Sequence, residues 1–273
     1  MIVGILGQGE IGSSLHGVYT LANVADVAQV VVRDPPRGRD VCLSNCDIVN
    51  VCIPYLGYDE FVQVLRDLGL RAGCVVIIQS TVAVGCTDRA QEDLPSLVCV
   101  HSPVRGQHPA LTEGLLTFEK YVGMSDRFSG DEKVTSLVTR HITTLGMEPV
   151  VCRAKESELA KLVSTTLYGM NIAAVTDVSR MCQEVGVDFE KVFTRWQTGY
   201  NAGYMALGKP NVRRPVLTPI LTNEGQQQQQ QQQQQEQVIG GHCVLPNCVL
   251  LTESVGETDL SGFVMRYSSS ERK

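Results

Sequence analysis

Residues 1–12, MIVGILGQGEIG, place a glycine-rich turn directly behind a short apolar run. The run Met1–Leu6 predicts a buried β-strand, and the residues after Gly12 have the character of a helix. The turn has the spacing G-x-G-x-x-G in a strand–turn–helix setting, which is the fingerprint of a dinucleotide-binding unit. The first glycine allows the tight turn, the second lets a pyrophosphate reach the backbone, and the third lets helix and strand pack closely.

A carboxylate follows the next predicted strand at the distance that suits NAD. Val27–Val32 is the predicted strand, and Asp34 lies 22 residues beyond Gly12. A carboxylate at this place hydrogen-bonds the ribose hydroxyls of NAD. Arg33, beside it, leaves NADP open as the alternative. A glycine turn that binds no ligand is the other interpretation of the same residues.

The first half of the chain alternates between strand-like and helix-like segments. This alternation predicts an α/β fold, a Rossmann-type doubly wound parallel sheet with helices on both faces. Ligands of such sheets lie beyond the carboxyl ends of the strands, where Ser80-Thr81 and His101–Pro103 are placed. Thr81 is equally suited to be a helix N-cap. The predicted strands are Asp47–Ile53, Cys74–Gln79, Leu97–Val100, Lys120–Met124 and Glu148–Cys152, and the helices lie near Tyr58–Leu68 and Asp131–Thr144. The predicted cofactor contacts are Gly7, Gln8, Gly9, Glu10, Ile11, Gly12, Asp34 and Thr81.

A long helix is predicted at Ala154–Gly186, where apolar residues recur at helical spacing and Gly186 supplies the stop. Such a helix is ~50 Å long, more than one small domain can cover, so we expect it to mediate a homodimer. Lys161 and Thr165 are four residues apart and share one face. By residue type alone, a lysine near Glu156 and Glu158 is normally solvated.

The rest of the chain changes character. Asp188–Trp196 predicts a short helix, and the glycine- and proline-rich residues 199–219 predict a loop. Gln226–Gln235 is an unbroken glutamine tract, which we expect to be a passive disordered insertion. The expected organisation is a dinucleotide-binding domain at 1–152, a central helical dimerisation segment at 153–200, and an active-site loop with the glutamine insertion and tail at 201–273.

Composition limits the class of protein. The chain has 273 residues, a formal net charge of −6 and a pI near 5.4, which argue against nucleic-acid and anionic-membrane partners. It has no apolar run of transmembrane length and no signal-peptide pattern at its start. Its ten cysteines are scattered without zinc-site spacing. We therefore expect a cytoplasmic protein with no metal site and no structural disulfides.

Five segments, in this order, resemble the UDP-glucose/GDP-mannose dehydrogenase family: ILGQGEIG, CDIVNVCIP, QSTVAVG, ELAKL and IGGHC. The resemblance covers residues 1 to about 251 and implies that the family's third, substrate-binding domain is lacking. It also implies NAD as cofactor and two successive oxidations, from alcohol to aldehyde and then from a cysteine thiohemiacetal to a thioester that water hydrolyses. Thr81 matches the threonine that positions this water, Lys161 the lysine that stabilises an oxyanion, and Cys243 the nucleophile.

Three positions depart from the family pattern. Thr165 replaces an asparagine, Asn247 replaces an aspartate, and Val104 replaces a glutamate, so slow thioester hydrolysis is expected. The segment SPVRG is similar to that of the β-hydroxyacid dehydrogenases, which perform one oxidation. Three hypotheses follow: a nucleotide-sugar dehydrogenase, a single-step dehydrogenase of a small hydroxy-acid, and a non-catalytic cofactor-binding remnant that acts through dimerisation. The predicted catalytic residues are Cys243, Lys161, Thr81, Asn247 and Thr165.

Overall fold

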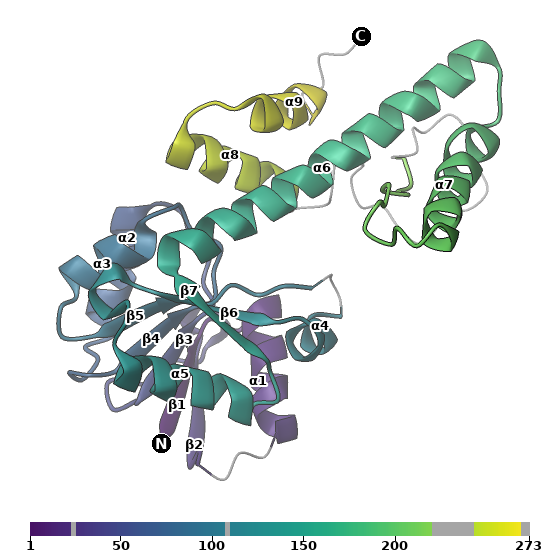
Figure 1. Cartoon of the computed structure of the whole chain (residues 1–273). Helices are drawn as coiled ribbons and strands as arrows, with labels where there is room; N and C mark the ends of the chain where they lie inside the picture. Colours follow the sequence, from purple (N-terminus) through teal and green to yellow (C-terminus); the bar gives the residue numbers. More distant parts are fainter. Residues whose placement is uncertain (23–25, 107–109, 220–242, 269–273) are drawn as a thin grey trace. The chain divides into compact units, whose positions relative to one another are not determined.

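The computed structural model describes residues 1–22, 26–106, 110–219 and 243–268. The chain divides into two compact units, Met1–Lys161 and Leu162–Lys273. The first unit contains the β-sheet, and the described part of the second is built from helices (Figure 1). The glutamine tract lies outside the described residues.

The first unit contains a seven-stranded sheet in the order β2-β1-β3-β4-β5-β6-β7. Strands β1 to β5 are parallel, β6 pairs antiparallel with β5, and β7 is parallel to β6. The predicted α/β Rossmann-type fold is confirmed, and the sheet is parallel except where β6 pairs with β5. The short helix α4 (Leu111–Thr117) packs against α1 instead of carrying the chain back along the sheet, so β6 starts beside the end of β5. The strands are β1 (Ile2–Leu6), β2 (Gln29–Arg33), β3 (Ile48–Val51), β4 (Val75–Ile78), β5 (Val98–His101), β6 (Lys120–Met124) and β7 (Pro149–Arg153).

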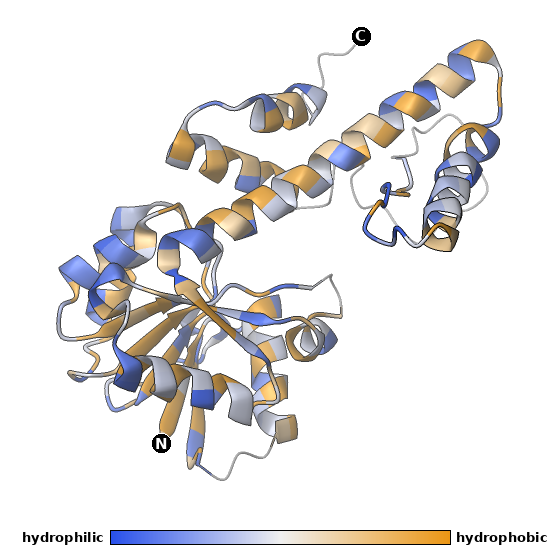
Figure 2. Ribbon diagram, viewed as in Figure 1, coloured by the Kyte–Doolittle hydropathy of each residue, from blue (hydrophilic) through white to orange (hydrophobic). Residues whose placement is uncertain are grey.

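Both faces of the sheet are covered, and successive strand residues enter opposite cores. Ile48 packs on the side of α1, α4 and α5, whereas its neighbour Val49 packs on the side of α2 and α3. Side chains alternate across a strand, so a strand covered on both faces is mostly apolar, as Figure 2 shows for much of the sheet. Burying each valine or isoleucine contributes about 1.5–3 kcal/mol. The helices are α1 (Glu10–Ala22), α2 (Tyr58–Asp67), α3 (Cys86–Asp93) and α5 (Glu132–Thr144).

Helices α3 and α4 were missed in the sequence. Helix α3, CTDRAQED, is mostly polar and buries only Cys86, Thr87, Ala90 and Gln91, so it lacks a broad apolar stripe. Helix α4 has seven residues, which is too short for a periodic pattern. Both are stabilised mainly by tertiary packing, α3 against β5 and α4 against α1, rather than by their own sequence.

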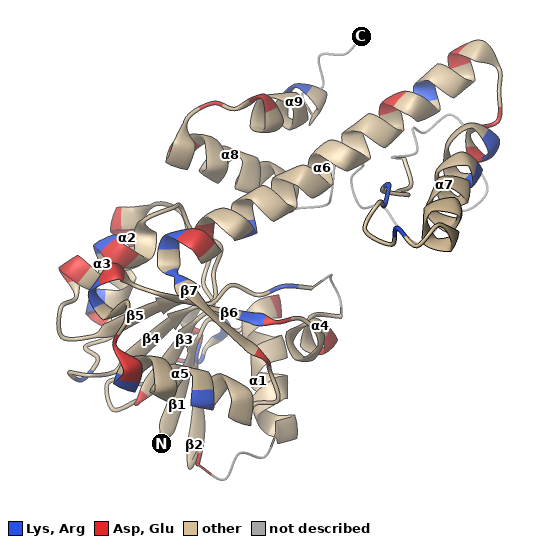
Figure 3. Cartoon of the chain, in the orientation of Figure 1, with Lys and Arg blue, Asp and Glu red and all other residues tan. Residues whose placement is uncertain are grey.

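The predicted long helix is confirmed as α6 (Ala154–Val185), whose 32 residues span about 48 Å. It ends where Gly186 adopts a φ of 72°, a left-handed conformation typical of helix C-termini. Between Lys161 and Asp177 the helix carries no charged residue, a gap that is visible in Figure 3. Large apolar side chains in and beyond this stretch are exposed: Leu167 by 41%, Tyr168 by 47% and Met181 by 58%.

The second unit is helical where the sequence predicted a loop. A π-helical turn, Glu190–Thr194, leads into α7 (Arg195–Ala206), so the loop predicted from residue 199 was wrong up to residue 206. Trp196, Tyr200 and Tyr204 recur every four residues, and their rings lie 6.3 and 6.2 Å apart. These ring contacts lie along one side of α7, although Gly199 and Gly203 lie within the same helix. Helices α8 (Val244–Val255) and α9 (Asp259–Ser268), which had not been predicted, pack with α6 around Ile172, Ala173, Val244, Cys248, Val264 and Tyr267.

Candidate active site

The turn after β1 is built around its glycines. Gly7 has a φ of 88°, and a Cβ added there would lie 2.7 Å from the carbonyl oxygen of Cys52. A Cβ on Gly12 would overlap the carbonyl oxygen of Gly7. A Cβ on Gly9, in contrast, would meet nothing within 4 Å. The first and third glycines are therefore required by packing, whereas the second borders open space.

Asp34 lies beside this turn at the end of β2. The backbone N–H of Gln8 donates to Asp34 Oδ2 at 2.7 Å, and Asp34 is only 8% exposed. Arg37 donates to the carbonyl oxygen of Gln8 at 2.5 Å and lies 3.8 Å from the Asp34 carboxylate. Arg33 is paired elsewhere, with Asp40 at 2.6 Å. The carboxylate is thus fixed against the glycine turn, and neither arginine is without a partner.

These residues fit a dinucleotide. Helix α1 begins at Glu10, so the backbone N–H groups of its first turn, which includes Ile11, lack intrahelical acceptors and can bind an anion. The open space beside Gly9 admits a pyrophosphate, and Asp34 is placed for a ribose. A bound nicotinamide dinucleotide supplies hydride transfer at such a site.

The polar residues at the strand ends have different roles. Ser80 donates to the carbonyl oxygen of Ile53 at 2.6 Å, and Ser102 donates to that of Tyr121 at 2.6 Å. His101 is completely buried and shares a 2.7 Å hydrogen bond with Ser157. Burial lowers the pKa of His101 to about 3, so its ring is neutral. These three side chains are thus engaged by the protein itself, and the expectation that the two strand ends face the cofactor crevice stays a prediction.

Thr81 is the partly exposed polar residue at the end of β4. The N-cap of the following helix α3 is Gly85, so the N-cap interpretation of Thr81 was wrong. Thr81 therefore lies at the carboxyl edge of the sheet, where ligands of parallel sheets bind, without a capping function.

Lys161 reaches the segment that follows β5. Its Nζ donates to the carbonyl oxygen of Val104 at 3.0 Å, and the residue is half-buried. Glu158, one turn earlier, is fully buried and accepts hydrogen bonds from Gly85 N, Thr87 N and Thr87 Oγ1 at 2.6, 2.9 and 2.6 Å. Burial raises the pKa of Glu158. Glu158 thus anchors α6 on the first turn of α3, and this contact places Lys161, which is half-buried rather than solvated as its residue type alone suggested.

A buried lysine at the same edge was missed in the sequence. Lys120 is 2% exposed, and its Nζ donates to Gln79 Oε1 at 2.6 Å and to the carbonyl oxygens of Ser102 and Pro103 at 2.7 and 3.1 Å. Burial lowers its pKa to about 7. The signal that could have found it is a lysine as the first residue of an apolar strand, KYVGM.

The other predicted catalytic residues belong to the second unit. Cys243 is half-exposed and is the N-cap residue of α8, and Asn247 is buried one turn further along that helix. Thr165 is half-buried on α6. Within this unit α8 packs on α6, where Cys248 Sγ lies 3.7 Å from Thr166 Oγ1. This packing brings the start of α8 towards the part of α6 that holds Thr165.

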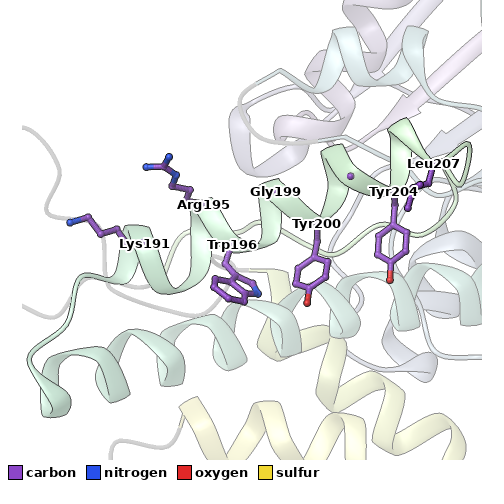
Figure 4. A pocket seen from close by; sticks show the side chains of 8 residues that line it. Lys191, Arg195, Trp196, Gly199, Tyr200, Tyr204 and Leu207 are labelled. Carbon is purple, nitrogen blue, oxygen red and sulfur yellow. The ribbon is translucent and has the colours of Figure 1, made fainter.

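A shallow groove of about 610 Å³ lies on α7 and contains none of the predicted catalytic residues. Figure 4 shows Trp196, Tyr200 and Tyr204 on one side of the helix, with Lys191 and Arg195 projecting elsewhere. Trp196 is 62% exposed. The groove is an exposed aromatic surface of the second unit rather than a catalytic cleft.

The chain is similar in sequence to UDP-N-acetyl-D-mannosamine dehydrogenases, although no protein-family model matches it. It is 25% identical to the enzyme of Methanococcus vannielii over 190 residues, which are 66% of this chain and 40% of that protein. The Methanocaldococcus jannaschii protein is 26% identical over 190 residues, with 67% and 40% covered. The chain is a relative of the nucleotide-sugar dehydrogenases. The match spans only about 40% of the length of these curated relatives.

The fold agrees with this relationship to the nucleotide-sugar dehydrogenases. The UDP-D-ManNAc dehydrogenase of Pyrococcus horikoshii superposes with a TM-score of 0.71 at 18% identity, covering 98% of this chain and 68% of that one. A 3-hydroxyisobutyrate dehydrogenase of Mycobacterium tuberculosis gives 0.65 at 15% identity, covering 97% and 92%. At these identities the two structures establish the Rossmann-type fold. No helix in the described ranges has the length and apolarity needed to cross a membrane.

Proposed function

We propose that the chain is an NAD-dependent dehydrogenase that oxidises a primary alcohol of a nucleotide sugar. The observation that carries this proposal is the convergence of two features on the carboxyl edge of the sheet. The glycine turn follows β1, and the amine of Lys161 lies 3.0 Å from the carbonyl oxygen of Val104, just after β5. Parallel strands bind their ligands at this edge, so cofactor and amine share one crevice. The named relatives are dehydrogenases of nucleotide sugars.

The residues supply the chemistry of two successive oxidations. The Lys161 ammonium stabilises the negative charge that develops on the substrate oxygen, and Thr81 orients the attacking water. The Cys243 thiolate adds to the aldehyde carbon, and oxidation of the resulting thiohemiacetal leaves a thioester. Water cleaves the thioester, which releases the acid and returns the thiol. Thr165 and Asn247 supply further hydrogen-bonding groups for this chemistry.

The residues around the ribose position support NAD over NADP. The Asp34 carboxylate would repel a 2′-phosphate, and Arg33 is engaged by Asp40 and by the carbonyl oxygen of Val41. Arg37 is held against Gln8 and Asp34. An additional phosphate would therefore have to break existing contacts before it gained a cationic partner.

A single-step oxidation of a small β-hydroxyacid is the second candidate. It is favoured by Val104, an apolar buried residue where the two-step family has a glutamate. The similar fold of the 3-hydroxyisobutyrate dehydrogenase, 92% of whose chain is covered by the superposition, supports this second candidate further. In this reaction Lys161 would act on the alcohol, and Cys243 would have no role.

The number of NADH molecules formed per product separates the candidates. The protein is incubated with NAD and either UDP- and GDP-sugars or small 3-hydroxyacids, and NADH is counted against product. Two NADH per nucleotide-sugar acid supports the first candidate, and one NADH from a hydroxyacid supports the second. Lys161→Ala should lower either rate by about 100-fold. Binding of NAD without turnover of any substrate would refute both and favour a non-catalytic remnant.

We also propose that the chain forms a homodimer through its second unit. The described core of that unit is small, and α6 leaves Leu167, Tyr168 and Met181 exposed. Apolar surface of this extent typically marks a protein interface. Sedimentation equilibrium at micromolar concentration should give twice the chain mass, and a monomer would contradict the proposal.

A further inference from the structure

The loop that follows β2 has the sequence DPPRGR and a backbone that is held by its own contacts. Two prolines restrict the backbone φ angles and lead into a 3₁₀ turn at Pro35–Arg37. Gly38 then adopts a φ of 74°, a left-handed conformation that glycine reaches without steric cost. The N–H of Asp34 donates to the carbonyl oxygen of Arg39 at 2.7 Å, and the N–H of Arg39 donates back to that of Asp34 at 3.1 Å. The loop therefore presents the Arg37 side chain from a preorganised backbone.

The Arg37 side chain reaches back to the glycine turn with the edge of its guanidinium group. Its Nη1 donates to the carbonyl oxygen of Gln8 at 2.5 Å, and the Ser13 hydroxyl donates to the same oxygen at 3.1 Å. The five N–H donors of a guanidinium lie in its plane, so the edge rather than the face meets the turn. The Gln8 contact uses one of these donors, and the side chain is 61% exposed. Donors therefore remain for a ligand that lies on the turn.

The glycine turn has negative charge around the place where it would bind a pyrophosphate. The Asp34 carboxylate lies beside the turn, and Glu10 carries a second carboxylate in the first turn of α1. The N–H of Gln8 is donated to Asp34 and is lost to a ligand. The N–H groups at the start of α1 supply a partial positive charge of about half a unit, which is less than the negative charge of a pyrophosphate. A cation at the turn would offset the difference, and among the described contacts Arg37 is the cation that hydrogen-bonds the turn.

We propose that Arg37 is a further cofactor-binding residue, whose guanidinium binds the pyrophosphate of the dinucleotide while it stays on the carbonyl oxygen of Gln8. Guanidinium and phosphate pair through parallel, charge-assisted hydrogen bonds, which a neutral side chain cannot match. A 2′-phosphate would instead lie at Asp34, so it could use Arg37 only by drawing it away from the turn. The proposal rests on the dinucleotide cofactor of the proposed function, and it is independent of the substrate.

Binding of ADP-ribose and of adenosine to the full chain tests the proposal. ADP-ribose contains the pyrophosphate and adenosine does not; calorimetry measures the first, and ligand-observed NMR at millimolar concentration measures the second. Arg37→Gln removes the charge but keeps an amide donor, and it should weaken ADP-ribose binding ~10–100-fold and leave adenosine binding unchanged. Arg37→Lys keeps the charge and should restore part of the loss. Arg39→Gln removes an equal, exposed charge from the same loop and should weaken ADP-ribose binding less than ~3-fold, because salt screens distant charges.

Three results would overturn the proposal. They are unchanged ADP-ribose binding in Arg37→Gln, an equal loss for adenosine, which would place Arg37 on the adenine, and an equal loss in Arg39→Gln, which would show a long-range charge effect. If Arg37→Gln does not fold, phenylglyoxal labelling of the unsubstituted protein decides the question. This reagent modifies arginine side chains, and ADP-ribose but not adenosine should protect Arg37, as read by peptide mass spectrometry; an unprotected Arg37 refutes the proposal.

These measurements separate the proposal from the proposed function. Because no substrate is needed, the role of Arg37 can be refuted while NADH forms, or supported while no substrate is oxidised. Failure of the unsubstituted protein to bind ADP-ribose would refute the role of Arg37 and the cofactor of the proposed function together.

Discussion

Replacing Gly7 or Gly9 by alanine should separate folding from cofactor binding in one turn. At Gly7 the backbone has a φ of 88°, and the new Cβ would lie 2.7 Å from the carbonyl oxygen of Cys52. The left-handed conformation costs about 1–2 kcal/mol for alanine. Displacing a backbone neighbour in a packed core costs about 1–3 kcal/mol more. Gly7→Ala should therefore destabilise the protein by about 2–5 kcal/mol.

Gly9→Ala is the matched substitution with the opposite outcome. Its Cβ meets nothing within 4 Å, and Gly9 is not among the glycines with positive φ. Alanine should leave stability unchanged or raise it by about 0.4–1 kcal/mol. The methyl group would, however, occupy the space of the pyrophosphate. Losing two charge-assisted hydrogen bonds of about 1.5 kcal/mol each predicts about 100-fold weaker NAD binding.

Urea unfolding and calorimetric titration with NAD provide the two measurements. The expected pattern is a lower unfolding midpoint with Gly7→Ala and a normal midpoint with weak NAD binding for Gly9→Ala. If Gly9→Ala bound NAD as tightly as the unsubstituted protein, the pyrophosphate would not lie at this turn. If Gly7→Ala were as stable as the unsubstituted protein, the steric reasoning would be wrong.

Three further substitutions or conditions give sharp expectations. Asp34→Asn keeps an acceptor for the Gln8 N–H but removes the charge, so the NAD-to-NADP affinity ratio should fall about 10-fold by calorimetry; an unchanged ratio would exclude Asp34 as the discriminating residue. Burial lowers the pKa of His101 to about 3 and that of His141 to about 4, so both stay neutral when the unfolded chain begins to protonate near 6.5. The contribution of these two neutral imidazoles to the free energy of unfolding is therefore fully present above pH 6.5. Below this pH the free energy of unfolding should fall by about 1.4 kcal/mol per pH unit for each imidazole. Acid unfolding without such a slope would contradict this expectation. Cys243→Ser should halve the NADH formed per molecule of nucleotide sugar, and intact mass should show an acyl adduct on the unsubstituted protein only; full two-step turnover in the variant would rule out the thioester route.

The sequence predicted those elements whose patterns of apolar residues and glycines lie within a short stretch of the chain. The strand β1, the glycine turn and helix α6 were found because apolar runs, glycine spacing and helical periodicity lie within short windows. The ends of most predicted strands agree with the structure to within two residues. The antiparallel direction of β6 could not be predicted, because the length of a connection does not say to which end of the sheet the chain returns. The loop predicted from residue 199 was wrong up to residue 206, because the two glycines of α7 were given more weight than the aromatic residues beside them.

The sequence by itself determined the Rossmann-type unit and its glycine turn, since each depends on residues that are close along the chain. Lys161 became a candidate catalytic residue only through the resemblance of ELAKL to the dehydrogenase family. Only the tertiary structure decided the roles of Glu158 and Lys120. Both are charged residues of types that are normally solvated, and both are buried by strands and helices distant in sequence. Glu158 meets Gly85 and Thr87, more than 70 residues away, and Lys120 meets Gln79 from a strand that is not its neighbour in the sheet. Such partners are set by the packing of the whole sheet, because a buried charge persists only where the fold delivers the donors and acceptors that satisfy it.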